Sequence, residues 1–156
     1  MTAVADVQAG TVHATVEIAA PPESVFRALT DPGELPRWWG SPDVYQTHDW
    51  KLDLRPGGRW SCQARSAEGT GEVRGEVLAV EPPRLLEYTW EASWEQYKQS
   101  IVRYTLEKVP GGTRLSLLHR GLASDESTRG HAEGWTQALG WLANRFAGTQ
   151  AARSSA

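Results

Sequence analysis

Two histidines are the residues of this sequence best suited to chemistry. His119 shares one face of a strand-like pattern with Leu115 and Leu117, and His131 lies at helical spacing from Trp135. Imidazoles that project into an apolar cavity can orient a ligand or act as acid and base. Both side chains also fit structural roles, His119 bonded to backbone at a strand end and His131 near solvent in a first helical turn. We assign no catalytic residue and keep His119 and His131 as candidates.

The remaining reactive groups do not form a recognisable catalytic or metal site. Cys62 is the only cysteine, which excludes an intramolecular disulfide and a cysteine-built zinc site. Because Cys62 shares a face with Trp60, we expect a buried and inert thiol. The four histidines lack metal-ligand spacing, and no paired carboxylates, phosphate loop or nucleophile elbow occurs. The sequence therefore predicts no metal, no cofactor and no evident catalysis.

Tryptophan is unusually frequent, with eight residues against four tyrosines and two phenylalanines. A buried indole still needs a partner for its N–H, which favours half-polar cavities and interfaces. The rings expected to point inward either fill the space between sheet and helix or surround a cavity, and their total bulk favours the cavity. The candidate ligand-binding residues are Trp39, Trp60, Tyr88, Trp90, Tyr104, His119, Trp135 and Leu139.

The adjacent pair Trp38 and Trp39 poses a separate question, because neighbouring side chains leave the backbone in different directions. Both rings of such a pair seldom enter one core. We expect Trp38 to anchor a short helical turn and Trp39 to lie at the mouth of the cavity.

The elements that must position these side chains follow from periodicity. Residues 11–18 alternate as a half-buried strand, residues 21–31 form a short helix, and a helical turn carries the tryptophan pair. About six antiparallel strands follow in hairpin order, with turns at "RPGG" and "PGGT". An amphipathic helix begins at Ser124 or Asp125 and ends before Gly148. We therefore predict an α+β domain over residues 11–147, with flexible tails at 1–10 and 148–156.

Composition limits the classes of partner. The chain has 156 residues and a formal net charge of −3, so no basic surface argues for nucleic acid. No apolar run reaches the ~18 residues that span a bilayer. The first ten residues carry no secretory signal pattern. These features predict a cytoplasmic protein with no nucleic-acid or membrane partner.

Five stretches in order resemble one known superfamily. They are "APPESVFRALTDPGELPRWWG", "DLRPGGRW", "GEVLAVEPPRLLEYTW", "TRLSLLHRGL" and "GHAEGWTQALGWLANRF". Together they are similar to the START-like helix-grip superfamily (SRPBCC), in its bacterial branch homologous to the activator of heat-shock protein 90 ATPase. The resemblance covers residues 11–146 and implies a Bet v-type fold, in which a curved antiparallel sheet of six to seven strands grips a long C-terminal helix, with short helices between the first two strands.

The resemblance also implies a hydrophobic cavity, since members of the superfamily bind lipids, hormones and polyketides. Eukaryotic co-chaperones of this branch carry a separate N-terminal chaperone-binding domain, whereas ten residues precede the first expected strand here. We therefore do not expect a chaperone partner.

Three functional hypotheses remain open at this point. The first is binding of a small apolar or amphipathic ligand, such as a lipid, polyketide or aromatic molecule. The second is a cyclase or hydrolase in which His119 or His131 acts as base while Tyr88 or Tyr104 polarises a carbonyl. The third is an interaction module without a ligand, with an exposed aromatic patch of Trp38, Trp39 and Trp94 that would also fit a homodimer.

Overall fold

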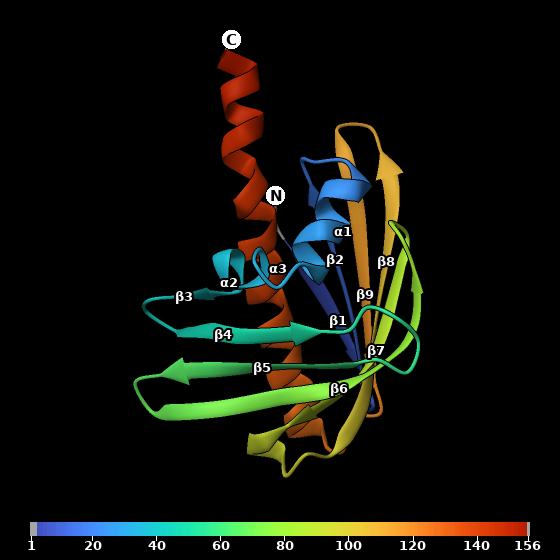
Figure 1. Ribbon diagram of the computed structural model, residues 1–156, viewed down its shortest axis with the longest axis vertical. Helices are drawn as coiled ribbons and strands as arrows, with labels where there is room; N and C mark the ends of the chain where they lie inside the picture. Colours follow the sequence, from blue (N-terminus) through green and yellow to red (C-terminus); the bar gives the residue numbers. More distant parts are fainter. Residues whose placement is uncertain (1–2, 156) are drawn as a thin grey trace.

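One antiparallel sheet of nine strands wraps around a long helix in the computed structural model, which describes the backbone of residues 3–155 and the side chains of residues 3–147 (Figure 1). The strand order in the sheet is β1-β2-β9-β8-β7-β6-β5-β4-β3. The predicted α+β helix-grip fold is thereby confirmed, but with more strands than predicted. The strands are β1 (Val4–Gln8), β2 (Thr11–Ile18), β3 (Gly40–Ser41), β4 (Tyr45–Leu52), β5 (Arg59–Ser66), β6 (Gly69–Glu81), β7 (Leu85–Ala92), β8 (Gln99–Val109) and β9 (Gly112–Arg120).

The two additional strands are the short edges of the sheet. Residues 4–8 were predicted to be part of a flexible tail, but they form β1 and pair with β2 through a tight turn at Gly10, whose φ is +70°. Their side chains are mostly exposed, so hydrophobic alternation gave no signal for a strand. Backbone pairing to the free edge of β2 holds the segment instead. Residues 1–2 of the predicted tail lie outside the described residues.

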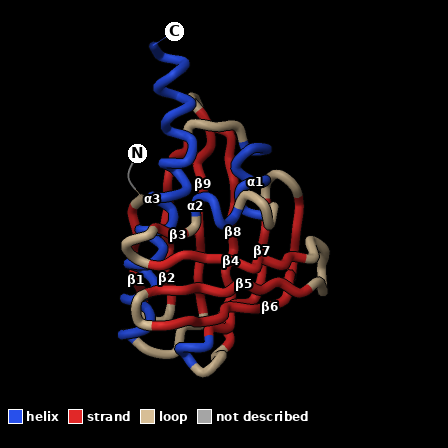
Figure 2. The backbone as a smooth tube through the Cα atoms, turned by 60° about the vertical axis from the view of Figure 1, so that its left-hand side comes forward, coloured by secondary structure: helices blue, strands red, loops and turns tan. Residues whose placement is uncertain are grey.

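The helices are α1 (Pro22–Thr30), α2 (Leu35–Trp38), the 3-10 turn η1 (Ser93–Glu95) and α3 (Asp125–Ser155). The helix α3 continues past Gly148, where the sequence predicted a flexible tail. Gly148 is followed by helix-forming residues such as Gln150, Ala151 and Ala152, so one glycine does not end the helix. Figures 1 and 2 show this last part of α3 extending beyond the sheet. Residue 156 and the side chains of 148–155 lie outside the described residues.

The core lies between the concave face of the sheet and the helices. Its fully buried side chains come from α3 and from the middle strands, including Leu86, Leu115, Leu117, Leu139 and Leu142. No helix in residues 3–155 is both long enough and apolar enough to cross a membrane.

Two irregularities bend the sheet near its β3 end. Pairing of β4 with β5 shifts register between His48 and Lys51, where Asp49 adopts a φ of +52°. Pairing of β6 with β7 shifts between Val77 and Ala79. Such bulges increase strand twist and bending. As a result β4, β5 and β6 cross over the lower part of α3 (Figure 1), while β1 and β2 pack along it.

Candidate ligand site

A groove of about 1130 Å³ lies between the first half of α3 and the bent strands β4, β5 and β6. Five tryptophans line it: Trp39, Trp50, Trp90, Trp94 and Trp135. The α3 side of the groove carries Gly130 and Gly134, and a Cβ added to either glycine would meet no atom within 4 Å. The helix therefore leaves open space where a larger side chain would fill the groove.

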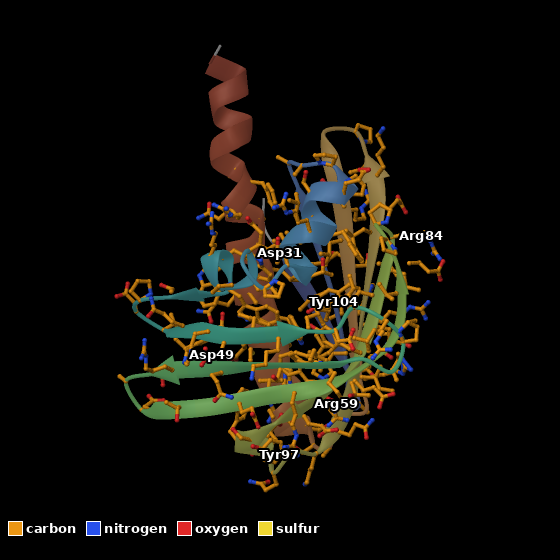
Figure 3. All side chains as sticks on the ribbon, in the orientation of Figure 1. Asp31, Asp49, Arg59, Arg84, Tyr97 and Tyr104 are labelled. Carbon is orange, nitrogen blue, oxygen red and sulfur yellow. The ribbon has the colours of Figure 1, made fainter. Side chains whose placement is uncertain are left out.

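A continuous cluster of aromatic rings lies beneath the groove. The ring centroids of Trp60 and Tyr88 are 4.4 Å apart, those of Trp90 and Trp135 are 5.3 Å apart, and those of Tyr88 and Tyr104 are 5.6 Å apart. These are contact distances for offset or edge-to-face packing. The inward rings thus fill much of the interior rather than surrounding one central void. Figure 3 shows Tyr104 inside the molecule, between the strands and the helices.

Hydroxyl groups inside this cluster satisfy each other. The hydroxyls of Tyr88 and Tyr104 are 2.7 Å apart and share one hydrogen bond. Burial, with the neighbouring hydroxyl, raises the pKa of Tyr88 well above its ordinary value, and burial does the same for Tyr104. Both phenols stay protonated and serve as packing groups.

His119 is fully buried and held by two hydrogen bonds. The indole N–H of Trp135 donates to Nδ1 of His119 at 2.9 Å, so Nδ1 carries no proton. Nε2 then carries the proton and donates to Oγ of Ser100 at 2.6 Å, and that hydroxyl donates to the carbonyl of Trp90 at 3.4 Å. Burial first, and His131 second, lower the pKa of His119 to about 2. The imidazole is therefore a neutral structural link between β9, β8 and α3.

His131 lies closer to the surface than His119 and lines the groove. Its Nε2 lies 2.8 Å from Oε1 of Glu95, and its ring centroid lies 4.6 Å from that of His119. Oγ of Ser127 donates to the other carboxylate oxygen of Glu95. Burial opposes ionisation of Glu95, but the hydrogen bonds from Ser127 and His131 outweigh it, and the pKa of the carboxyl lies below its ordinary value. These three side chains form the polar end of the groove and join η1 to α3.

Cys62 also lines the groove but remains unreactive. Its side chain is buried, and burial raises the pKa of the thiol to about 12. A thiol is a nucleophile mainly as thiolate, so this environment suppresses covalent chemistry. In residues 3–147, no group of three or more His, Cys, Asp or Glu side chains is arranged to hold a metal ion.

The structure divides the predicted ligand-binding residues into two layers. Trp39, Trp90 and Trp135 line the groove. The other predicted residues lie one layer deeper and are absent from its lining: Trp60, Tyr88, Tyr104, His119 and Leu139. Their inward orientation was expected, but periodicity does not distinguish a side chain that reaches a groove from one that packs beneath it.

Both rings of the tryptophan pair lie in the core, stacked with their centroids 5.0 Å apart, although one core was not expected to hold both. The indole N–H of Trp38 donates to the carbonyl of Ala28 at 2.9 Å, which ties α2 to α1. The ring of Trp39 lies on the groove and its N–H donates to the hydroxyl of Tyr45 at 3.2 Å. Both rings are at most 5% exposed, so they do not form the predicted exposed patch, and of the patch only Trp94 is exposed, at 54%.

The cyclase or hydrolase hypothesis requires a histidine within hydrogen-bond distance of Tyr88 or Tyr104. Neither His119 nor His131 makes such a contact. In the described residues, the hydrogen bonds of the His119 ring go to Ser100 and Trp135, and that of the His131 ring goes to Glu95. The hydroxyls of Tyr88 and Tyr104 bond to each other. The structure therefore places no imidazole beside a phenol that could polarise a carbonyl.

Trp50 and Glu95 are groove residues that the sequence did not single out. Strict alternation from the buried Thr47 places Trp50 on the outer face, but the bulge at Asp49 returns it to the inner face, where its ring centroid lies 5.3 Å from that of Trp39. Glu95 lies in a turn, where a carboxylate usually indicates only solvent exposure. The glycines at positions 130 and 134 were a usable signal, because glycine inside a helix usually has a packing or functional reason.

Comparison with known proteins identifies the family. Residues 19–147 match the family model described as activator of Hsp90 ATPase homolog 1-like protein. The chain belongs to this family. The predicted resemblance is thereby confirmed, and the matched range contains α1, the groove strands and the groove half of α3.

Solved structures of other bacterial proteins, one of them named after the same Hsp90-ATPase-activator homolog 1 family, have the same architecture. The protein so named from Silicibacter pomeroyi is 33% identical, with a TM-score of 0.74, and the alignment covers 88% of this chain and 97% of that one. CalU16 from Micromonospora echinospora is 26% identical, with a TM-score of 0.66 and coverage of 97% and 87%. A Rhodobacter sphaeroides protein at 23% identity, with a TM-score of 0.81 and coverage of 95% and 99%, supports the fold alone. No curated protein matches the chain.

Proposed function

We propose that this protein binds a small apolar or amphipathic molecule, of lipid, polyketide or aromatic type, in the groove between α3 and strands β4–β6. The observation that carries the proposal is the composition of the groove, in which five indole rings and the glycines Gly130 and Gly134 of α3 line a volume of about 1130 Å³. Ligand sites are typically concave and mostly apolar, with a few polar groups that fix orientation. The groove has that character, with Glu95 and His131 at its polar end.

The rim of the groove suits an amphipathic ligand. Charged side chains of both signs, among them Arg65, Glu68, Lys98 and Glu126, line it beside the aromatic wall. A ligand with an apolar body could bury that body against the indoles and leave a polar group near these charges. Burial of apolar area would supply most of the affinity.

Filling the groove from α3 tests the proposal without removing a core side chain. Fluorescence titration of the wild-type protein with fatty acids, polyketides and flavonoids should give saturable quenching for at least one ligand class. The variant Gly134→Leu places a side chain in the open space and should weaken that binding at least tenfold, since the ligand and the leucine compete for one volume.

Gly140→Leu is the matched control. Gly140 also lies in α3 with no atom within 4 Å of an added Cβ, but it does not line the groove. This variant should bind as the wild type does. The proposal is wrong if no ligand of the panel quenches the wild-type protein, or if Gly134→Leu binds with unchanged affinity.

A further inference from the structure

The polar end of the groove contains an oriented imidazole. His131 and Ser127 lie one turn apart on α3, and both bond to the carboxylate of Glu95 in η1. A side chain held by a carboxylate at one ring nitrogen has its ring plane and its other nitrogen fixed in direction. Glu95 thus acts as a positioning residue for His131.

The hydrogen-bond pattern assigns the free nitrogen of His131. Nε2 faces the carboxylate at 2.8 Å and must donate to it, since a carboxylate only accepts. In the neutral imidazole, Nδ1 then carries a lone pair and accepts a hydrogen bond. Only two buried side-chain nitrogens of the described residues lack a partner, Nε2 of His48 and Nε1 of Trp90, so Nδ1 of His131 keeps access to solvent.

Trp90 supplies a second polar group in the same wall. Its ring lies edge-on to that of His131 with centroids 6.0 Å apart, and both residues line the groove. The indole N–H of Trp90 is buried and has no partner among the described residues. A buried N–H without a partner is unfavourable. A ligand oxygen that reached it after a small ring movement would relieve this cost.

We propose that His131 and Trp90 form a subsite for a hydroxyl group, and that the ligand of this groove is an aromatic molecule with a phenol-type O–H. The hydroxyl donates to Nδ1 of His131 and offers its oxygen to the indole N–H of Trp90, while the aromatic body packs against Trp39 and Trp135. This inference rests on the proposed function of the groove. It adds the class of ligand and the atom that selects it.

A pair of ligands that differ only in the donated hydrogen bond tests the subsite. We would measure the affinity of 2-naphthol and of 2-methoxynaphthalene by isothermal titration calorimetry at pH 8. The ether keeps the ring and the acceptor oxygen but has no O–H. The wild-type protein should bind 2-naphthol about tenfold more tightly, because one donated hydrogen bond is lost with the ether.

Two substitutions separate recognition of the hydroxyl from support of the fold. His131→Gln keeps a donor for Glu95 at the position of Nε2 and lacks Nδ1, so it should bind both naphthalenes equally while unfolding at the wild-type temperature. His131→Phe should give the same loss of preference. His13→Gln, an exposed histidine of β2 outside the groove, should keep the tenfold preference.

The outcomes distinguish the two proposals. Equal affinities in the wild-type protein would overturn the hydroxyl subsite and leave the ligand-binding function in place. A preference that survives in His131→Gln would also overturn it, and this result needs no other variant to fold. If neither naphthalene binds the wild-type protein and the wider panel also fails, the ligand-binding function falls, and the subsite with it.

Discussion

His119 illustrates how packing at a single residue fixes a protonation state. Its two ring nitrogens are both engaged, one accepting from Trp135 and one donating to Ser100, and no solvent reaches the ring. A proton added to Nδ1 would face the indole N–H that now donates to it. The folded state therefore resists protonation of this histidine, whereas the unfolded chain takes up the proton at the ordinary pKa of an imidazole.

This difference in proton binding makes the stability of the protein depend on pH. Between pH 6.5 and about 2, the unfolded state binds a proton that the folded state does not, so stability falls as the pH falls below about 6.5. This one group should lower the free energy of unfolding by about 2 kcal/mol between pH 7.5 and pH 5.0. Urea unfolding at the two pH values measures it.

His119→Gln is the comparison that isolates this residue from the carboxylates. The variant should be less stable at every pH, because the buried hydrogen bonds are lost, but its loss of stability between pH 7.5 and pH 5.0 should be about 2 kcal/mol smaller. An equal loss in the two proteins would contradict the assignment of a neutral, buried imidazole.

At the scale of elements, β5, β6 and β7 are joined by a tryptophan that crosses a glycine. Trp60 of β5 pairs with Gly75 of β6, and its indole N–H passes over that glycine to donate to the carbonyl of Thr89 in β7 at 2.9 Å. A Cβ at position 75 would lie 1.9 Å from that carbonyl oxygen and 2.4 Å from the indole nitrogen. The absence of a side chain at position 75 is what lets the ring bridge three strands.

Gly75→Ala should therefore destabilise the protein strongly, by about 3 kcal/mol, because a strand must move and a buried hydrogen bond breaks. Gly140→Ala is the reverse case, since α3 has open space at that position and alanine is the better helix former. It should add up to about 1 kcal/mol to the free energy of unfolding. Denaturant unfolding of both variants tests the pair, and similar effects of the two substitutions would refute this account of Gly75.

The same elements show what the sequence could and could not predict. The strands β2, β5, β8 and β9 and the helix α3 were predictable because burial imposes a hydrophobic period on them. The strand β1 was not, since backbone pairing at a sheet edge leaves its side chains free to be polar. Trp50 was missed because one bulge reverses the parity of its strand, and Glu95 because nothing in a turn sequence indicates which distant helix it will meet.

At the scale of the whole molecule, the fold depends on one interface between α3 and the sheet. Leu139 packs at that interface. Its side chain is fully buried and does not line the groove. Leu139→Ala should lower the free energy of unfolding by about 2–5 kcal/mol, through lost burial and the cavity left behind. Ligand affinity of the folded protein should stay unchanged, although the sequence placed Leu139 in the binding site.

Thermal unfolding and calorimetric titration of the same sample check both halves of this prediction. Leu78→Ala serves as control, because Leu78 is 38% exposed, and its substitution should change the free energy of unfolding by less than about 0.5 kcal/mol. A loss of affinity in Leu139→Ala without a loss of stability would place the residue in the site after all.

The floor of the groove has a consequence for how such a protein can diverge. Trp39, Trp90 and Trp135 form this floor, and they also belong to the hydrophobic core. A mutation that reshapes the floor therefore also lowers the free energy of unfolding, which is small for any domain. Substitution of rim residues, such as Arg65, Trp94 and Glu126, should cost little folding stability, because these side chains lie outside the core. Homologues selected for a new ligand are thus expected to differ at the rim of the groove and to keep the residues of its floor almost unchanged.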